Sequence, residues 1–327
     1  MLQAGLGCSL HVEILGLGIL ICWKNSLNFI KDLIAIKTFV MKTGIYNSFY
    51  TPMGLVNLEH LAHGCVHMEW EGMHIYVDPC SDFFDFTGCK KADLILLTHA
   101  HTDHYDTKAI EEIAMPNTTF IVSRGVRTVL ENDLLAMRAG TAKRPDGKLL
   151  PRLDLDNNPL NVDPSTNLVS MLNIPKLRHC KVVTLENGDS VSSIGLTITA
   201  IPAYNINYKR DNGHPFHIKG EGNGYLISMQ GFDIYFAGDT EPIPEMNELA
   251  PGAVRAHSWS QFLQGEIDVA FLPKNLPYTM SDEDFIKAAN LIKPKNLFPI
   301  HYFEINPKAL NRKLNTGICL YVGGKQI

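Results

Sequence analysis

A short apolar segment that ends in a cluster of histidine and aspartate side chains constrains the fold of this chain more than any other stretch. Residues 94–97 are all leucine or isoleucine, and the ligand-type residues His99, His101, Asp103 and His104 follow directly. An apolar run of this kind predicts a buried strand, so the polar cluster falls on the loop that leaves its end. Two histidines that are two positions apart in extended backbone can face the same way. Because neutral imidazole and carboxylate groups bind zinc and similar ions, the stretch predicts a metal site.

The same plan occurs twice more in the chain. Residues 233–237 form a largely apolar strand pattern that ends in Gly238 and Asp239, and residues 297–300 form another that ends in His301. Glycine lets the backbone approach its neighbours closely, and a carboxylate can bridge two cations. We therefore expect three strand ends, far apart in the sequence, to converge on one site.

Three motifs resemble those of the metallo-β-lactamase superfamily. They are Thr-His-Ala-His-Thr-Asp-His at 98–104, Ala-Gly-Asp-Thr at 237–240 and Pro-Ile-His-Tyr at 299–302, and the likeness extends over residues 57–305. Most members of that superfamily are dinuclear metal hydrolases, so the resemblance implies the same for this chain. It also implies an α/β (α+β) fold, a four-layer αββα sandwich in which two mixed sheets face each other and helices cover the outer faces.

The resemblance further implies which side chains hold two divalent ions. The implied ligands are His99 and His101 for the first ion, Asp103, His104 and His301 for the second, and Asp239 as a bridge between them. Zinc is the expected ion, although manganese and iron accept the same donors. Two such ions would share a hydroxide as the nucleophile, because they lower the pKa of bound water to about 7. Asp103 would also be catalytic, orienting that hydroxide or returning a proton to the leaving group.

One expected ligand is missing. Many superfamily members place a histidine for the first ion where this chain has Tyr204 and Asn205. Residues 203–217 are similar to predicted metal-dependent hydrolases related to L-ascorbate-6-phosphate lactonase, and on that resemblance His217 is the candidate replacement. A histidine on a loop or in contact with the substrate explains the sequence equally well. Tyr204, Asn205 and Tyr278 lie near the predicted ligand loops and are candidates for binding the substrate.

The chain divides into an extension and one large domain. Residues 1–45 contain a hydrophobic run at 14–23, which is too short to span a bilayer and lacks the basic segment that precedes a signal peptide. The loosely helical pattern at 27–40 fits a membrane-surface helix, but a dispensable extension is the favoured interpretation. Residues 46–327 form the hydrolase domain, in which a segment at 141–176, rich in proline and without periodicity, predicts an inserted loop or flap.

Local patterns predict several further elements. Alternating apolar residues and a Glu-Gly turn predict a β-hairpin over 66–77. Helices are expected from Asp106 to about Ala114 and over 125–139. Ser281 and Asp284 have the spacing of a capping box at the start of another helix.

Four more histidines lie on or next to the predicted hairpin, and we exclude them from the ligand set. They are His60, His63, His67 and His74. Their spread along two strands is typical of surface residues or of residues that support a site from behind. His63 is the one that we keep in reserve.

Composition narrows the functional classes. A formal charge of −5 and a pI near 6.2 disfavour a surface built for nucleic-acid phosphates. The seven cysteines are scattered without C-x-x-C spacing, which indicates reduced thiols in an intracellular, cytoplasmic protein.

The preferred function is a metal-dependent hydrolase of a small anionic lactone or ester, with phosphate-bearing substrates included. Two alternatives stay open: a phosphodiesterase that acts on a phospholipid or nucleic acid, and a metal-binding protein without catalytic activity. The expected partner is a small molecule, with no nucleic acid. Membrane contact through the extension and formation of a homo-oligomer are not excluded by the sequence.

Overall fold

The computed structural model describes residues 11–15, 18–22, 46–139, 177, 180–263 and 265–327. The chain separates into two compact units, Met1–Gly44 and Ile45–Ile327. In the first unit, β1 (His11–Leu15) pairs with β2 (Gly18–Cys22) in an antiparallel hairpin. The predictions for 27–40 and for the insertion at 141–176 lie outside the described residues. None of the helices in the described part is long and apolar enough to cross a membrane.

A seven-stranded sheet begins the second unit. Its strands are β3 (Asn47–Thr51), β4 (Gly54–Ala62), β5 (Cys65–Trp70), β6 (Met73–Val77), β7 (Ala92–Leu97), β8 (Ala114–Ser123) and β9 (Lys181–Leu185), in that order. Neighbours from β3 to β6 are antiparallel, and those from β6 to β9 are parallel. The predicted hairpin is confirmed as β5 and β6, with Glu71 and Gly72 at φ values of 51° and 76° in the turn.

A second sheet of eight strands follows along the chain. Its strands are β10 (Ser190–Ser193), β11 (Leu196–Ala203), β12 (Gly222–Ser228), β13 (Asp233–Phe236), β14 (Val269–Pro273), β15 (Asn296–Ile300), β16 (Cys319–Val322) and β17 (Lys325–Gln326). The order is again sequential, with parallel pairs from β13 to β16 and antiparallel pairs on both sides. Both sheets are therefore mixed, as predicted.

Buried apolar side chains fill the space between the two sheets. Val56 and Leu94 from the first sheet share one cluster with Ile198 and Phe271 from the second. Burial of such side chains stabilises the fold by about 1.5–3 kcal/mol each.

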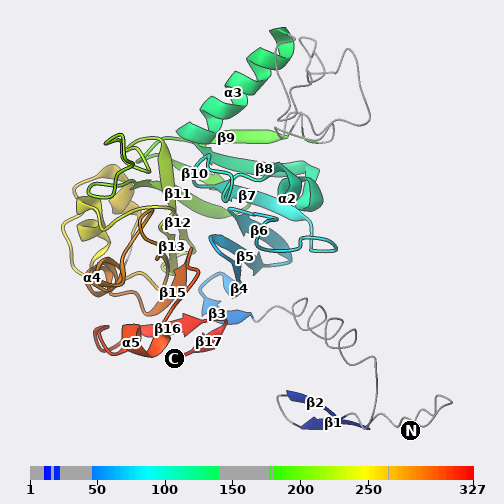
Figure 1. The fold of residues 1–327 in the computed structure, drawn as a ribbon, viewed down its shortest axis with the longest axis vertical. Coiled ribbons are helices and arrows are strands. Elements are labelled where there is room, and N and C mark those ends of the chain that lie inside the picture. Colours follow the sequence, from blue (N-terminus) through cyan, green and yellow to red (C-terminus); the bar gives the residue numbers. More distant parts are fainter. Residues whose placement is uncertain (1–10, 16–17, 23–45, 140–176, 178–179, 264) are drawn as a thin grey trace, which may run out of the picture. The chain divides into compact units, whose positions relative to one another are not determined.

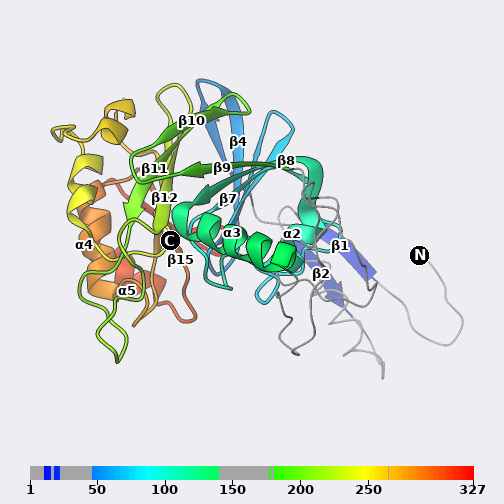
Figure 2. The ribbon, with the colours of Figure 1, turned by 90° about the horizontal axis from the view of Figure 1, so that it is seen from above.

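Helices cover the outer face of each sheet. Those on the seven-stranded sheet are α2 (Thr107–Ile113) and α3 (Arg124–Ala139); those on the eight-stranded sheet are α4 (Asp282–Ile292), α5 (Pro307–Asn311) and the 3₁₀ helices η3 (Pro244–Leu249) and η4 (Ser258–Phe262). Figures 1 and 2 show α4 and α5 on one flank of the domain and α2 and α3 on the other. The predicted αββα sandwich is confirmed.

The helix starts also follow the sequence. Asp106 caps α2 by accepting a hydrogen bond from the backbone N–H of Lys108 at 2.9 Å. Ser281 and Asp284 form the predicted capping box of α4.

The ends of the parallel strands bring the two sheets together at one edge. There, the backbone N–H of Asn223 on β12 donates to the carbonyl of Thr98, just beyond β7, at 2.9 Å. The N–H of His301, just beyond β15, donates to the carbonyl of His63 at 2.7 Å. These two backbone hydrogen bonds fix the loops that carry the predicted ligands.

Candidate metal centre

Asp239 lies at the middle of the predicted site. Its Oδ2 is 3.2 Å from Nε2 of both His217 and His301, and it is 3.5 Å and 3.8 Å from Nε2 of His104 and His99. The three strand ends predicted to converge do so here.

Gly238 explains how the backbone delivers this carboxylate. Its φ is +64°, a conformation that favours glycine. A Cβ at this position would lie 2.6 Å from the carbonyl oxygen of Asn223, so a side chain would push β12 and β13 apart.

Three histidines form one group of possible ligands, which we call the all-histidine group. Nε2 of His99 is 3.0 Å from Nδ1 of His101, and Nε2 of His217 is 3.2 Å from the same Nδ1. The donor atoms of the three all lie within 4.8 Å of one another. The structure thus brings His217, the candidate replacement ligand, to both predicted ligands of the first ion.

A second group, the mixed group, also contains side chains that face Asp239. It consists of His63, Asp103, His104 and His301, with donor atoms within 4.8 Å of one another. Oδ2 of Asp103 is 3.1 Å from Nε2 of His63, 3.3 Å from that of His301 and 3.6 Å from that of His104.

Two buried atoms that could bind a metal ion have no hydrogen-bond partner, and this shows that the centre fits a cation. Among the described residues, these atoms include Nε2 of His104 and Oδ1 of Asp239. Burial of an uncompensated polar atom costs free energy, and a cation between the two groups would compensate it. Imidazole nitrogen and carboxylate oxygen suit zinc, manganese and iron.

Asp78, just after β6, sets the orientation of the first ligand loop. Its carboxylate accepts hydrogen bonds from Nδ1 of His104 at 2.8 Å and from the backbone N–H and Oγ1 of Thr98 at 2.8 Å and 2.6 Å. Because Nδ1 of His104 donates to Asp78, Nε2 is the nitrogen that faces the centre, and it would bind a cation once that cation displaces its proton. Oγ1 of Thr98 in turn contacts Nδ1 of His99 at 3.0 Å.

The pKa shifts keep His99 and His101 neutral, whereas they keep Asp239 and His301 charged. Burial lowers the pKa of His99 and lowers that of His101 to about 4, so both are neutral imidazoles. Burial alone would raise the pKa of Asp239, but the positive charges of His301 and His104 hold it well below its ordinary value. Burial opposes protonation of His301 too, yet Asp239 and Asp103 raise its pKa to about 9. A cation that binds there would replace that proton.

His63 is the reserve candidate that the structure places in the site. It is buried, its ring stacks on Phe83 with centroids 4.1 Å apart, and it lies 3.8 Å from the ring of His301. His67 and His74 contact each other at 3.1 Å instead, in keeping with their exclusion from the ligand set.

The three residues predicted to bind substrate have different surroundings. Tyr204 is buried and donates its hydroxyl to Glu245 at 3.0 Å, and Asn205 is hydrogen-bonded to His217. Tyr278 is exposed, with its ring 5.0 Å from that of Phe216. Contact of any of these with substrate stays a prediction.

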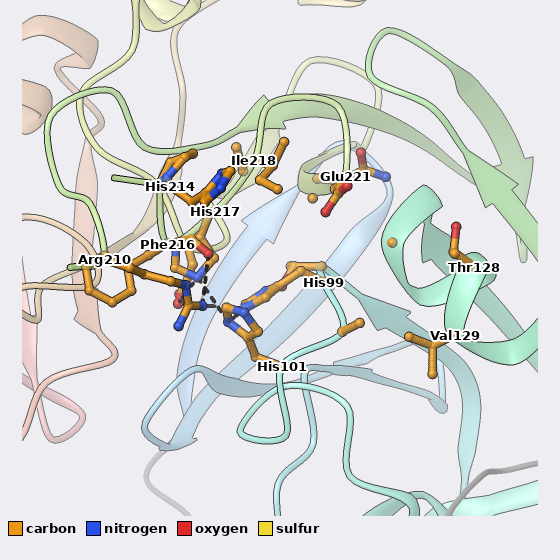
Figure 3. Close-up of a pocket in the computed structure, with 18 of the residues that line it drawn as sticks. His99, His101, Thr128, Val129, Arg210, His214, Phe216, His217, Ile218 and Glu221 are labelled. Carbon is orange, nitrogen blue, oxygen red and sulfur yellow. Dashed lines mark hydrogen bonds and ion pairs between the residues drawn. The ribbon is translucent and has the colours of Figure 1, made fainter. Parts of the chain in front are cut away.

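A cavity of about 450 Å³ opens beside the all-histidine group. His101 and His217 line it together with Arg210 and Phe216, all four of which are labelled in Figure 3. The guanidinium of Arg210 lies 5.0 Å from the centroid of the Phe216 ring and donates to the Phe216 carbonyl at 3.5 Å. Thr128 from α3 lines the cavity as well.

Residues 57–301 match the model of a family described as the β-lactamase superfamily domain. The curated relatives include the UPF0173 metal-dependent hydrolase YtkL of Bacillus subtilis, which is 25% identical over 267 residues, or 78% of this chain and 92% of the relative. A UPF0173 metal-dependent hydrolase of Thermococcus onnurineus is 27% identical over 212 residues, or 65% of this chain and 67% of the relative.

Solved structures agree with the fold. A Parabacteroides distasonis protein described as a metal-dependent hydrolase is 31% identical, with a TM-score of 0.59 over 85% of this chain and 97% of that one. Igni18, a metallo hydrolase of Ignicoccus hospitalis, is 20% identical, with a TM-score of 0.51 over 83% of this chain and 97% of that one. The second likeness supports the fold alone.

Proposed function

The chain belongs to the metallo-β-lactamase superfamily and is a metal-dependent hydrolase, and from that premise we propose that it uses two divalent ions to cleave a small anionic ester or lactone. The observation that carries the dinuclear proposal is the position of Asp239. Its Oδ2 faces His217 of one donor group and His301 of the other at the same distance of 3.2 Å. A carboxylate in that position can be shared by two ions.

The proposed ligands follow from the two groups. His99, His101 and His217 would hold one ion, Asp103, His104 and His301 the other, with Asp239 shared and His63 as an added donor to the second. Zinc suits this donor set, and manganese or iron are accepted by it. When bound, the ions would supply a water-derived nucleophile at neutral pH and polarise the carbonyl or phosphoryl oxygen of the substrate.

Asp103 has a role that the buried Asp239 cannot have. Its side chain is 33% exposed, whereas that of Asp239 is 3% exposed. Hydrogen bonds with His63 and His301 fix the carboxylate at the entrance of the mixed group. Asp103 can therefore orient an incoming water molecule or return a proton to the leaving group.

The cavity supports an anionic substrate of small size. Arg210 is held on its wall by Phe216, so its charge is available a short way from the all-histidine group. Guanidinium is well suited to carboxylate and phosphate. A volume of about 450 Å³ fits a small molecule. The resemblance to L-ascorbate-6-phosphate lactonase motivates lactones and phosphate-bearing esters as the first substrates to test.

The proposal includes a cytoplasmic setting and a small-molecule partner. Cys65 and Cys80 are buried thiols, and burial raises the pKa of Cys80 to about 11. Such thiols are unreactive and are compatible with a reducing compartment. Assembly into a homo-oligomer is left as a prediction.

A substrate screen tests the function. The purified chain is stripped of metal, reloaded with Zn²⁺ or Mn²⁺ and offered lactones, phosphate esters, phosphodiesters, phospholipids and amides. Hydrolysis of an anionic lactone or ester only in the reloaded protein is the expected result. Turnover of phosphodiesters or phospholipids alone would favour the phosphodiesterase alternative. Two bound ions without turnover of any class would favour a non-catalytic metal-binding protein.

A further inference from the structure

The loop that carries His217 has an unusual internal support. Asn205 occupies the position where a histidine ligand is expected, but its side chain serves His217 instead. Its Oδ1 accepts the backbone N–H of His217 at 2.9 Å and faces Nδ1 of the same residue at 2.7 Å. Its Nδ2 donates to the Glu241 carboxylate at 3.1 Å and to the carbonyl of Tyr278 at 3.0 Å.

These contacts determine the orientation of the Asn205 amide. A backbone N–H on one side requires the amide oxygen there, and a carboxylate and a carbonyl on the other side require the amide nitrogen. The oxygen therefore faces the ring of His217, so Nδ1 of that ring must carry the proton. Nε2 is left with its lone pair, 3.2 Å from Oδ2 of Asp239.

Glu241 holds the start of the loop through several hydrogen bonds. Its buried carboxylate accepts the backbone N–H groups of Ile206 at 3.1 Å, Asn207 at 3.0 Å and Tyr208 at 2.6 Å. It also accepts Nδ2 of Asn207 at 2.9 Å. Successive N–H groups that point to one carboxylate stabilise its charge and fix the backbone that supplies them.

The segment that follows β13 supplies both Asp239, the proposed shared ligand, and Glu241, which holds the loop. Glu241 is two residues after Asp239, and its backbone N–H donates to the carbonyl of Tyr204 at 3.1 Å. Thr240 between them donates its hydroxyl to that carbonyl at 3.1 Å. The position of the loop is thus tied to the position of Asp239.

We propose that Glu241 and Asn205 are positioning residues that make His217 the replacement ligand of the first ion. Glu241 fixes the amide of Asn205, and Asn205 fixes the tautomer and ring orientation of His217. The inference rests on the proposed function, because it requires an ion at the all-histidine group. It goes further in assigning a task to two residues that do not touch the ion.

The test compares metal binding by the full chain and by the variants Asn205→Leu and Glu241→Gln. Leucine keeps the size of the side chain without its hydrogen bonds, and glutamine introduces an N–H where the loop needs an acceptor. Zn²⁺ content and the affinity of each ion are measured by competition with a chelating dye. We expect one ion to bind about 10–100-fold more weakly in both variants, as for other residues that orient ligands, while the second ion is unaffected. Glu283→Gln, on the exposed first turn of α4, is the control and should bind both ions as the unchanged chain does.

Unchanged affinity for both ions in folded variants would overturn the inference. Should the variants fail to fold, a proton–nitrogen correlation spectrum of the zinc-loaded unchanged chain decides, with His217 assigned by comparison with His217→Gln. A proton on Nδ1 of His217 is expected, and a proton on Nε2 would overturn the proposal. Failure of the unchanged chain to bind two ions would refute the proposed function and this inference together. Two bound ions without hydrolysis would refute only the proposed function.

Discussion

The all-histidine group and the mixed group both face Asp239, yet the chain holds them by different means. The mixed group is built from the turn between β4 and β5, from the loop that follows β7 and from His301 directly beyond β15, with His301 tied by its backbone to His63. The all-histidine group needs His217, which comes from the long loop between β11 and β12. That loop keeps its place through hydrogen bonds to Asn205 and Glu241.

This difference indicates how the two ions should differ in strength of binding. A site on strand ends requires little ordering when the ion binds, whereas a site that depends on a loop also depends on the stability of that loop. The mixed group has four possible donors and the all-histidine group has three. We therefore expect the ion of the mixed group to bind more tightly.

Asp239→Asn should have the largest effect, because it removes a charge that both groups use. We expect loss of both ions and a fall in kcat/KM of about a thousandfold or more, since the stabilisation that metals provide amounts to several kcal/mol. Mass spectrometry measures the loss of the ions, and hydrolysis rates measure the fall in kcat/KM. Retention of one ion would show that the groups are independent of each other.

His217→Ala and His301→Ala each remove one possible ligand, the first from the all-histidine group and the second from the mixed group. Loss of His217 should leave about one ion per chain, bound by the intact mixed group, because the all-histidine group keeps only two of its histidines. Loss of His301 should weaken the second ion but not abolish its binding, since His63, Asp103 and His104 remain. Zn²⁺ titration by calorimetry measures both. Equal losses in the two variants would contradict the difference in strength.

Asp78→Asn should have a smaller effect, which is larger on the mixed group than on the all-histidine group. The amide can still accept one hydrogen bond but no longer favours the proton on Nδ1 of His104. We expect the affinity of the mixed group for Zn²⁺ to fall about 10–100-fold. The same titration measures the all-histidine group, which should be affected less because Asp78 reaches His99 only through Thr98. A larger loss of affinity at the all-histidine group than at the mixed group would contradict the assignment of Asp78.

Arg210→Gln should have the smallest effect on the centre itself. Arg210 lines the cavity but contacts the ring and carbonyl of Phe216 instead of a proposed ligand. We expect normal content of both ions and a KM for anionic substrates that is raised about 10–100-fold, as for loss of a charged hydrogen-bond partner worth about 1.5–3 kcal/mol. Steady-state kinetics with an anionic and a neutral ester distinguish the outcomes. A similar rise for both esters would argue against recognition of the anion by Arg210.

Most of the fold was predictable because its signals are local. The turn at Glu71, the cap at Asp106 and the capping box at Ser281 each depend on neighbours in the sequence, and each is confirmed. Strand β10 and the C-terminal strands β16 and β17 were not predicted, since these segments of four, four and two residues are too short to show a periodic pattern. Their pairing comes from the strands beside them in the sheet.

The candidate site was predictable where strands end in ligand-type residues. The clustering of His99, Asp239 and His301 follows from that pattern. His63 could not be assigned in the same way, because its place in the site depends on a backbone contact with His301, which is 238 positions further along the chain. Glu241 carried no signal except its position two residues after Asp239.

The centre also contains backbone in an unfavourable conformation. His63, Asp78 and His301 have φ values of 50°, 46° and 59°. This left-handed region costs a residue with a side chain about 1 kcal/mol. Selection of random variants for heat resistance alone should therefore favour glycine or asparagine at these three positions while activity disappears. Directed evolution of a thermostable catalyst from this scaffold would have to select for turnover in every round.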